Sequence, residues 1–274
     1  SSTGKTFFSL AVVKNFLDSH PDGYCLYFDT EAAISKSLLE SRGVDTTRLV
    51  VVRVVTIEDF RNKALKAVDI YLKAPVDERK PCMFVLDSLG MLSTDKEITD
   101  ALNEKQVRDM TKSQLVKGAF RMLTLKLGQA KIPMIVTNHT YDVIGAYVPT
   151  KEMGGGSGLK YASSTIVYLS KKKEKDGTDV VGNIIKAKTA KSRLSKENKV
   201  VEIRLFYDER GLDKYYGLLE LGELGGLWKN VAGRYEINGK KLYAKEIFKD
   251  PEKYFTAEVM QALDETAQKE FSYG

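Results

Sequence analysis

Two kinds of apolar pattern alternate along the first 140 residues of the chain. Short continuous apolar runs are typical of strands buried on both faces, and segments with apolar residues every three or four positions are typical of amphipathic helices. Strands that alternate with helices favour a parallel sheet covered by helices, so the pattern predicts an α/β fold. We expect strands at 24–28, 49–55, 82–88 and 134–139, and helices at 6–17, 34–41, 57–73 and 107–131.

The pattern changes in the second half of the chain. Residues 180–188 and 200–206 alternate between apolar and polar positions, as half-exposed antiparallel strands do. Further on, two short alternating segments flank Asn238-Gly239, which predicts a hairpin with a tight turn. We therefore expect a main domain at 1–211 and a small α+β C-terminal domain at 212–274.

Two segments predict loops rather than regular elements. Residues 93–106 are polar and acidic, without a clear period. Residues 140–160 contain the run Gly154-Gly155-Gly156-Ser157-Gly158, and glycines lose much backbone entropy when they are ordered. A flexible loop of about twenty residues inside a compact domain is usually functional.

Composition limits the class of protein and its environment. The chain is 43% hydrophobic and 29% charged, and no apolar run approaches the ~20 residues of a membrane span, which is typical of a globular protein with no membrane partner. Cys25 and Cys82 each lie in a strand-like run, which predicts buried free thiols in a reducing compartment. Two cysteines and two histidines show no metal-ligand spacing, so a zinc site is disfavoured.

The net charge of +6 is unevenly distributed. Residues 213–274 contain 9 lysines and arginines and 11 aspartates and glutamates, so residues 1–212 carry a net charge of +8. Residues 186–199 alone contain six basic residues and one acidic residue. This charge fits a polyanionic partner, but it would equally serve solubility, and the basic segment would then be a solvated hairpin tip.

The first six residues, Ser1-Ser2-Thr3-Gly4-Lys5-Thr6, match the last six positions of the phosphate-binding loop pattern G-x-x-x-x-G-K-[ST]. We expect the first glycine of the pattern to lie upstream of Ser1. In such a loop the backbone N–H groups face a triphosphate, the lysine reaches the β- and γ-phosphates, and the hydroxyl of the last residue is a ligand of Mg²⁺. The helix predicted to follow would hold the phosphates at its N-terminus. A Gly-Lys-Thr in an ordinary turn is the alternative if the motif is taken alone.

Two carboxylates follow predicted strands. Glu31 comes after the apolar run at 24–28, and Asp87 directly follows the apolar run at 82–86. Carboxylates at the carboxyl ends of parallel strands face the ligand crevice of an α/β sheet. With a phosphate loop upstream, Asp87 is predicted to hold Mg²⁺ directly or through water. The alternative is an aspartate that caps the next segment.

Several motifs occur together and in one order along the chain. With the phosphate loop, they closely resemble the RecA family of recombinases, and within it the UvsX-type recombinases of tailed bacteriophages, from Ser1 to at least Leu221. The resemblance implies a RecA-like P-loop NTPase core with a mostly parallel central sheet. The motifs are Phe28-Asp29-Thr30-Glu31, Val85-Leu86-Asp87-Ser88, Asp100-Ala101-Leu102-Asn103-Glu104-Lys105, Asn138-His139 and Met153-Gly154-Gly155-Gly156-Ser157-Gly158.

The resemblance implies roles for individual residues at the nucleotide. Glu31 matches the glutamate that orients the water attacking the γ-phosphate, although a carboxylate beside a helix N-terminus is the alternative. His139 stands where bacterial members have a glutamine that senses the γ-phosphate, and an imidazole can also donate to a phosphate oxygen. A histidine that only packs is the alternative. With Lys5 of the phosphate loop, these are the predicted catalytic residues.

A second set of residues concerns the neighbouring protomer and the adenine base of ATP. Lys191 and Arg193 resemble a basic pair that reaches across the subunit interface onto the neighbour's ATP, as an arginine finger does. Ser35 and Leu38 occupy the positions of the family's adenine-stacking tyrosine and a nearby aspartate.

The family also holds single-stranded DNA in two mobile loops, which here match 94–106 and 140–160. Because such loops grip DNA mainly through its phosphates, glycine N–H groups and a few cations suffice. Tyr141 and Tyr147 could stack on bases, or be simple surface residues. The candidate DNA-binding residues are Lys112, Lys117, Arg121, Gly154, Gly155, Gly156, Ser157 and Lys160.

The resemblance therefore implies a DNA-dependent ATPase of recombination and repair, with ATP and Mg²⁺ as cofactors. It would form a helical filament on single-stranded DNA and pair it with a homologous duplex, in the cytoplasm (that of the host cell if the chain is phage-encoded). A single-strand-binding protein and a loading factor are the expected partners. Two alternatives remain: a ring-shaped helicase or motor on the same fold, and a paralogue that binds nucleotide without hydrolysing it, which Glu31 and Asp87 disfavour.

Overall fold

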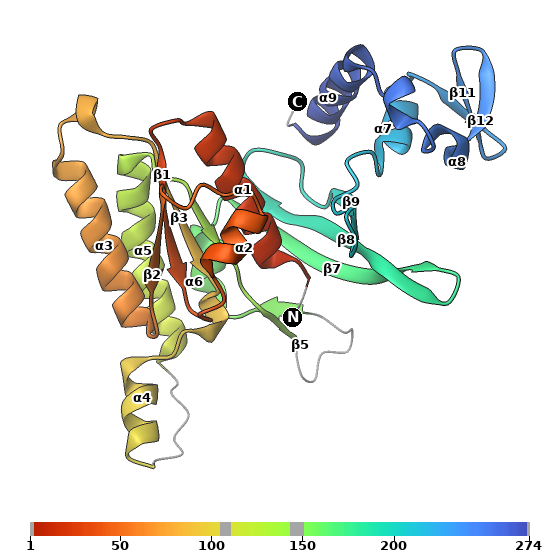
Figure 1. The fold of residues 1–274 in the computed structure, drawn as a ribbon. Helices are drawn as coiled ribbons and strands as arrows, with labels where there is room; N and C mark the ends of the chain where they lie inside the picture. The colour runs from red at the N-terminus through yellow and green to blue at the C-terminus, as the bar shows by residue number, and fades with distance from the viewer. Residues whose placement is uncertain (1–2, 105–110, 143–150, 273–274) are drawn as a thin grey trace. The chain divides into compact units, whose positions relative to one another are not determined.

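Four parallel strands in the order β2-β1-β3-β4 form the central sheet of the first unit of the chain (Figure 1). The computed structural model describes residues 3–104, 111–142 and 151–272, and the chain divides into two compact units between Ser163 and Ser164. The first unit contains β1 (Tyr24–Asp29), β2 (Leu49–Arg53), β3 (Cys82–Asp87) and β4 (Met134–Val136), the strands β5 (Thr140–Asp142) and β6 (Lys151–Met153), and the helices α1 (Lys5–Ser19), α2 (Lys36–Ser41), α3 (Ile57–Lys73), α4 (Asp95–Leu102), α5 (Lys112–Ala130) and α6 (Gly156–Ala162).

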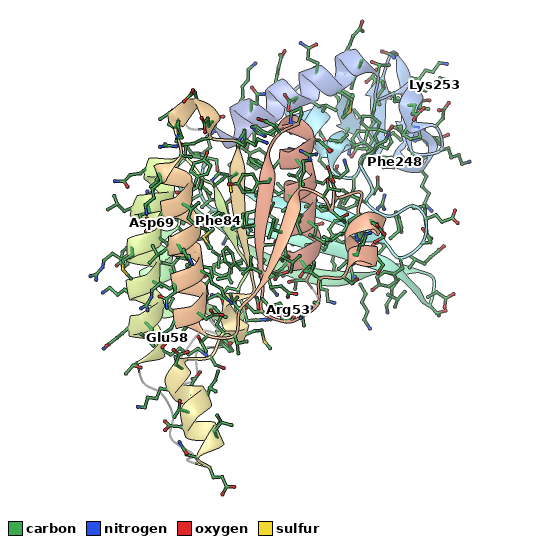
Figure 2. The ribbon with its side chains drawn as sticks, turned by 60° about the vertical axis from the view of Figure 1, so that its left-hand side comes forward. Arg53, Glu58, Asp69, Phe84, Phe248 and Lys253 are labelled. Atoms are coloured by element: carbon green, nitrogen blue, oxygen red, sulfur yellow. The ribbon has the colours of Figure 1, made fainter. Side chains whose placement is uncertain are left out.

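Each face of this sheet is covered by helices, as the predicted α/β fold requires. On one face, Phe28 and Phe84 pack into a single apolar cluster with residues of α3, α5 and α6, and Figure 2 labels Phe84. On the other face, Tyr27 and Val85 pack with residues of α1 and α2. Side chains of β1 and β3 alternate between the two clusters because successive residues of a strand point to opposite faces. All six residues of β3 are buried.

The predicted strands and most predicted helices of the first unit are present. The helix predicted at 57–73 has those bounds, and Thr56 caps it by accepting a hydrogen bond from the Asp59 N–H. The helix predicted at 107–131 is present as α5 from Lys112, with Thr111 as its N-cap, and residues 107–110 lie outside the described ranges.

The loop predicted at 93–106 was wrong, because Asp95–Leu102 forms α4. A capping box begins this helix: the Thr94 hydroxyl accepts from the Glu97 N–H, and the Glu97 carboxylate accepts from the Thr94 N–H. The pattern Thr-x-x-Glu is present in the sequence and marks a helix start. Its apolar residues, Ile98, Ala101 and Leu102, share one face of the helix, but none of them is buried, and eight residues give a short apolar pattern among many polar ones.

The glycine run is also more ordered than predicted. Gly155 has a φ of 90° and precedes α6, which begins at Gly156. A Cβ atom on Gly158 would lie 2.6 Å from the Cβ of Lys117, so α6 and α5 approach closely there. Leu159 joins the apolar cluster with Val116 of α5. Packing against α5 therefore offsets the entropy that the glycines lose.

In its described residues, the second unit combines two antiparallel sheets with the α-helices α7, α8 and α9 and a short 3-10 helix at Pro251–Lys253. Trp228 is buried in its core and donates from Nε1 to the Leu219 carbonyl at 2.7 Å. The predicted Asn238-Gly239 turn is present, with positive φ at both residues, as a type I′ hairpin requires. The elements are β7 (Thr165–Asp176), β8 (Asp179–Ser192), β9 (Val200–Phe206), α7 (Leu218–Leu224), β10 (Lys229–Val231), β11 (Arg234–Ile237), β12 (Lys240–Tyr243), α8 (Ala244–Ile247) and α9 (Ala257–Phe271).

Strand β8 is longer than the alternating segment predicted at 180–188. It continues to Ser192, so Lys191 belongs to a strand rather than to a hairpin tip. Both cysteines are buried and free, as predicted. None of the helices in the described part of the chain has the length and hydropathy needed to cross a membrane.

Candidate functional site

The carboxyl ends of β1 and β3 lie side by side at the point where the strand order changes direction. From β1 the chain continues to β2 on one side, and it then returns to place β3 and β4 on the other side. Ligands of open α/β sheets bind at such a switch point, beyond the carboxyl ends of the strands. Asp29 and Asp87 are paired residues at these two strand ends.

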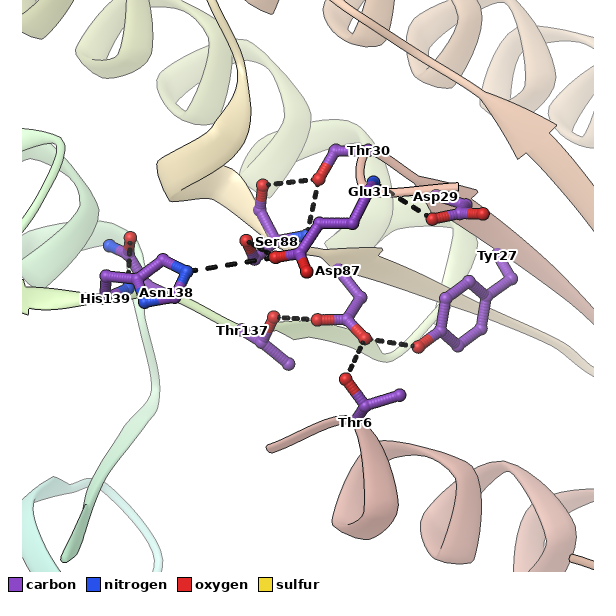
Figure 3. Close-up of polar contacts among 10 residues, drawn as sticks. All are labelled: Thr6, Tyr27, Asp29, Thr30, Glu31, Asp87, Ser88, Thr137, Asn138 and His139. Carbon is purple, nitrogen blue, oxygen red and sulfur yellow. Dashed lines mark hydrogen bonds and ion pairs between the residues drawn. The ribbon is translucent and has the colours of Figure 1, made fainter. Parts of the chain in front are cut away.

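Asp87 accepts hydrogen bonds from three hydroxyl groups that come from different elements (Figure 3). Its Oδ2 accepts from Thr6 Oγ1 at 2.7 Å and from the hydroxyl of Tyr27 at 2.7 Å. Its Oδ1 accepts from the hydroxyl of Thr137, which follows β4. Burial, and then the Asp87 and Asp29 carboxylates, raise the pKa of Tyr27, so the tyrosine stays a donor to Asp87.

The N-terminus of α1 lies at this carboxylate because Thr6 belongs to its first turn. Gly4 precedes the helix with a φ of 85°, a conformation that favours glycine. Lys5 is the first helical residue, and the first turn contains no acidic side chain. The free N–H groups and positive dipole of a helix N-terminus favour an anion such as phosphate.

A metal and a nucleotide fit these residues chemically. Hydroxyl and carboxylate oxygens, which Thr6 and Asp87 bring within 2.7 Å of each other, are the ligands that Mg²⁺ prefers. Lys5 would supply positive charge next to them. The predicted roles of Gly4, Lys5, Thr6 and Asp87 are thus compatible with their positions and stay predictions.

The backbone after β1 is fixed by side chains of the neighbouring strand ends. The Thr30 hydroxyl accepts from the Ser88 N–H at 2.8 Å and donates to the Ser88 carbonyl at 3.0 Å. The Asp29 carboxylate accepts from the N–H groups of Glu31 and Ile34. These bonds hold the residue that follows, Glu31, at the edge of the sheet.

The Glu31 carboxylate lies between a serine and the predicted sensor (Figure 3). Ser88 Oγ donates to Glu31 Oε1 at 2.9 Å, and the Nε2 of His139 lies 3.9 Å from the same oxygen. A Cβ atom on Gly90 would lie 2.7 Å from the His139 ring, so only a glycine at position 90 leaves room for the imidazole. The structure thus brings Glu31 and His139 together from separate strands.

Asn138 and His139 also contact the glycine run. Asn138 Nδ2 donates to the Gly154 carbonyl at 2.7 Å, and the Gly154 N–H donates to the His139 carbonyl at 3.1 Å. The end of β4 is therefore joined by hydrogen bonds to the segment predicted to hold DNA.

The family of the chain follows from a match over most of its length. A family model described as the RecA N-terminal domain matches residues 1–213. The chain belongs to this family. The predicted resemblance to RecA-family recombinases is confirmed.

Several curated proteins resemble this member of the RecA N-terminal domain family. The chain is 35% identical over 236 residues to the Recombination and repair protein of Enterobacteria phage T4, covering 86% of the chain and 59% of that protein. It is 28% identical over 243 residues to Protein RecA of a Nocardioides species, covering 88% of the chain and 66% of that protein. The chain therefore spans less than two thirds of the length of these two relatives. Protein RecA of Corynebacterium urealyticum is 28% identical over 276 residues, which cover 100% of the chain and 71% of that protein.

Some of the DNA-binding residues that the RecA resemblance implied lie together, on α5 and at the start of α6. Lys112 begins α5, and it lines a cavity of about 360 Å³ together with Gly154 and Gly155. Lys117 is exposed on α5 and touches Gly158, and Arg121 is exposed one turn further along. Gly156, Ser157 and Lys160 lie in α6.

Other predicted residues are not brought to this site by the described structure. Ser1, Ser2 and Tyr147, and the side chain of Ser157, lie outside the described residues. Lys191 and Arg193 belong to the second unit, at the end of β8 and just after it. Their contact with a neighbour's nucleotide stays a prediction.

Sequence reasoning missed four residues that contact the predicted site residues. Tyr27 and Thr137 donate to Asp87, Ser88 donates to Glu31, and Glu97 contacts Lys112. Tyr27 is two positions before the end of β1, on the same face as Asp29, and this was the available signal. The strand register that places it beside Asp87 is not visible in one sequence.

Proposed function

We propose that the protein is an ATP-dependent recombinase that forms a filament on single-stranded DNA and pairs that strand with a homologous duplex. One observation carries the proposal: Thr6, Glu31, Asp87 and His139 come from four segments and meet at one edge of the parallel sheet. Membership of the RecA N-terminal domain family supports it, as do relatives named for recombination and repair. These relatives favour a recombinase over a ring-shaped motor.

ATP would bind with its phosphates at the N-terminus of α1. Residues 1–6 would surround them with N–H groups, and Lys5 would contact the terminal phosphates. Thr6 and Asp87 would be the protein ligands of Mg²⁺, and the hydroxyls of Tyr27 and Thr137 would keep the Asp87 carboxylate oriented. Bound Mg²⁺ supplies positive charge that offsets the charge of the transferring phosphoryl group.

Glu31 would orient and polarise the water that attacks the terminal phosphate. Ser88 fixes the rotamer of this carboxylate through its 2.9 Å hydrogen bond, so the oxygen is positioned before substrate binds. His139 would donate a hydrogen bond to the terminal phosphate. Because the His139 and Asn138 bonds reach Gly154, loss of that phosphate would be transmitted to the glycine run.

We further propose that Lys112, Lys117, Arg121 and Lys160 contact DNA phosphates with the glycine run, and that Lys191 and Arg193 act on a neighbour's ATP. Functionally, residues 1–211 would form the ATPase core and 212–274 a C-terminal domain, a division that the family match over 1–213 supports. A single-strand-binding protein and a loading factor would act with the protein in the cytoplasm, that of the host cell for a phage protein.

The rate of ATP hydrolysis with and without single-stranded DNA tests this function. We expect hydrolysis that requires Mg²⁺ and rises when single-stranded DNA is added. Electron microscopy with a non-hydrolysable ATP analogue and DNA should then give helical filaments. Closed rings would support the helicase alternative, and an absence of hydrolysis with or without DNA would support a non-catalytic nucleotide-binding protein.

A further inference from the structure

Glu97 of α4 contacts Lys112, the first residue of α5. Its Oε2 lies 3.4 Å from the Nζ of Lys112, and the same oxygen accepts from the Thr94 N–H at 3.0 Å. The side chains of Glu97 and Lys112 are 31% and 36% exposed. The ion pair is therefore open to solvent and to competing ions.

Apart from the Glu97 carboxylate, the groups around this ion pair favour the binding of an anion. Glu97 and Lys112 line the cavity of about 360 Å³ together with Ser113, Tyr141 and the backbone of the glycine run. Lys112 and Ser113 form the first turn of α5, a 19-residue helix whose first turn contains no acidic residue. Its dipole favours negative charge at this end. Among the described residues that line the cavity, Glu97 is the one carboxylate.

A carboxylate thus occupies a place suited to a DNA phosphate. On the basis of the proposed function, we propose that Glu97 is a positioning residue: its carboxylate holds Lys112 in the absence of DNA and is displaced from it by a phosphate of the bound strand. Glu97 then acts as an internal competitor that lowers the affinity for DNA and favours release of the strand.

The exchange of partners requires little reorganisation of the fold. Glu97 stays on α4 through the capping box, because its carboxylate keeps the Thr94 N–H and its own N–H keeps the Thr94 hydroxyl. A solvent-exposed ion pair contributes at most about 1 kcal/mol, equivalent to about a fivefold change in an equilibrium constant. A DNA phosphate makes the same class of charge-assisted bond to Lys112, and counterion release from the strand adds to it, so the strand would displace the carboxylate.

The substitution Glu97→Gln separates the charge from the structural role. A glutamine amide still accepts from the Thr94 N–H, since capping boxes use Glu or Gln, but it no longer pairs with Lys112. Affinity for a fluorescently labelled oligothymidylate is measured by anisotropy at several salt concentrations, with ATP and Mg²⁺ present. We expect about two- to fivefold tighter binding, and a log–log salt dependence steeper by up to about 0.7, the contribution of one single-strand phosphate contact.

Two controls make the interpretation specific. In a Lys112→Gln background, Glu97→Gln should have no effect on affinity, because the competed cation is absent. Glu58→Gln is the matched control: this carboxylate accepts from the Asp95 N–H at the N-terminus of the same helix (Glu58 is labelled in Figure 2), and its loss should leave DNA affinity unchanged.

Unchanged or weaker DNA binding by Glu97→Gln would overturn the proposal. An effect that persists without Lys112 would overturn it as well. Failure of the proposed function itself would look different, because the wild-type protein would then bind no single-stranded DNA or would form closed rings on it in electron microscopy.

Discussion

The Nε2 atom of His139 lies 3.9 Å from the Oε1 atom of Glu31, although 108 positions of sequence separate the two residues. The same carboxylate oxygen accepts a hydrogen bond from Ser88, which comes directly after Asp87. The candidate base and the candidate sensor of the proposed function therefore lie together, beside the residue that follows Asp87. In that proposal, hydrolysis and its detection would be coupled by contact rather than over a distance.

Glu31→Gln should abolish turnover and leave binding intact. The amide keeps the shape of the side chain and can still accept from Ser88, but it cannot polarise a water as a carboxylate does. We expect the rate of ATP hydrolysis to fall about 10²–10⁴-fold, with the affinities for ATP and DNA little changed. Steady-state hydrolysis and nucleotide binding are the measurements, and Glu40→Gln, on the surface helix α2, is the control. Turnover retained in Glu31→Gln would exclude Glu31 as the base.

Asn138→Ala should uncouple the nucleotide from the glycine run. This substitution removes the side-chain bond to the Gly154 carbonyl and the bond that Asn138 Oδ1 accepts from the His139 N–H, whereas the backbone bond between Gly154 and His139 remains. One such bond contributes about 0.5–1.5 kcal/mol, so the increase in DNA affinity caused by ATP should shrink about two- to tenfold. DNA binding is compared with and without a non-hydrolysable ATP analogue. An unchanged ratio would show that the bond carries no coupling.

Gly158→Ala should destabilise the first unit by about 1–3 kcal/mol, because overpacking forces neighbouring atoms apart. The added Cβ would lie 2.6 Å from the Lys117 Cβ and 2.8 Å from its Cα, and the backbone atom cannot rotate away. Gly118→Ala is the matched control on α5: its Cβ would have no atom within 4 Å, and alanine should stabilise the helix by about 0.5–1 kcal/mol. Chemical unfolding compares the two. Equal effects would contradict the close approach of α5 and α6.

Apolar patterning predicted the elements whose burial is continuous or periodic. Strand β3 is buried at every position, and α3 has both an apolar stripe and a capping threonine, so both could be located from the sequence. Helix α4 has no buried residue and is short, so its capping box and its few apolar positions at helical spacing were easily overlooked. The ends of the strands pointed to Glu31, Asp87 and His139. Their geometry, however, depends on strand order and on residues such as Tyr27 that bond across strands, which a single sequence does not reveal.

The two cysteines should resist thiol reagents in the folded protein. Burial raises the pKa of Cys82 to about 12, and burial together with Cys82 raises the pKa of Cys25 well above its usual range. At pH 8 both thiols stay protonated and covered, so labelling with a disulfide reagent should be slow until urea unfolds the chain. Rapid labelling of the native protein would contradict the buried positions.

The raised pKa values of the two cysteine thiols also predict how the stability of the fold depends on pH. Thiols of the unfolded chain ionise near pH 8.5, whereas the folded thiols keep their protons, so unfolding releases protons above that pH. The stability that the protonated thiols contribute is complete below about pH 8.5. It is lost as the pH rises toward about 12, the pKa of Cys82 in the folded protein. The decrease in unfolding free energy between pH 8 and pH 10 should therefore be smaller in Cys82→Ala than in the wild type. An identical decrease would contradict the prediction.

The convergence of Thr6 and Asp87 on one metal-bound nucleotide is tested most directly by a double-mutant cycle. Affinity for ATP is measured with and without Mg²⁺ in Thr6→Val, Asp87→Asn and the double variant, after thermal unfolding has shown that each is folded. We predict that each single substitution lowers the Mg²⁺-dependent affinity for ATP about 10- to 100-fold. The affinity of the double variant should be no lower than that of the single variant with the lower affinity. Losses that simply add, or ATP binding that does not depend on Mg²⁺ in the wild type, would contradict the account.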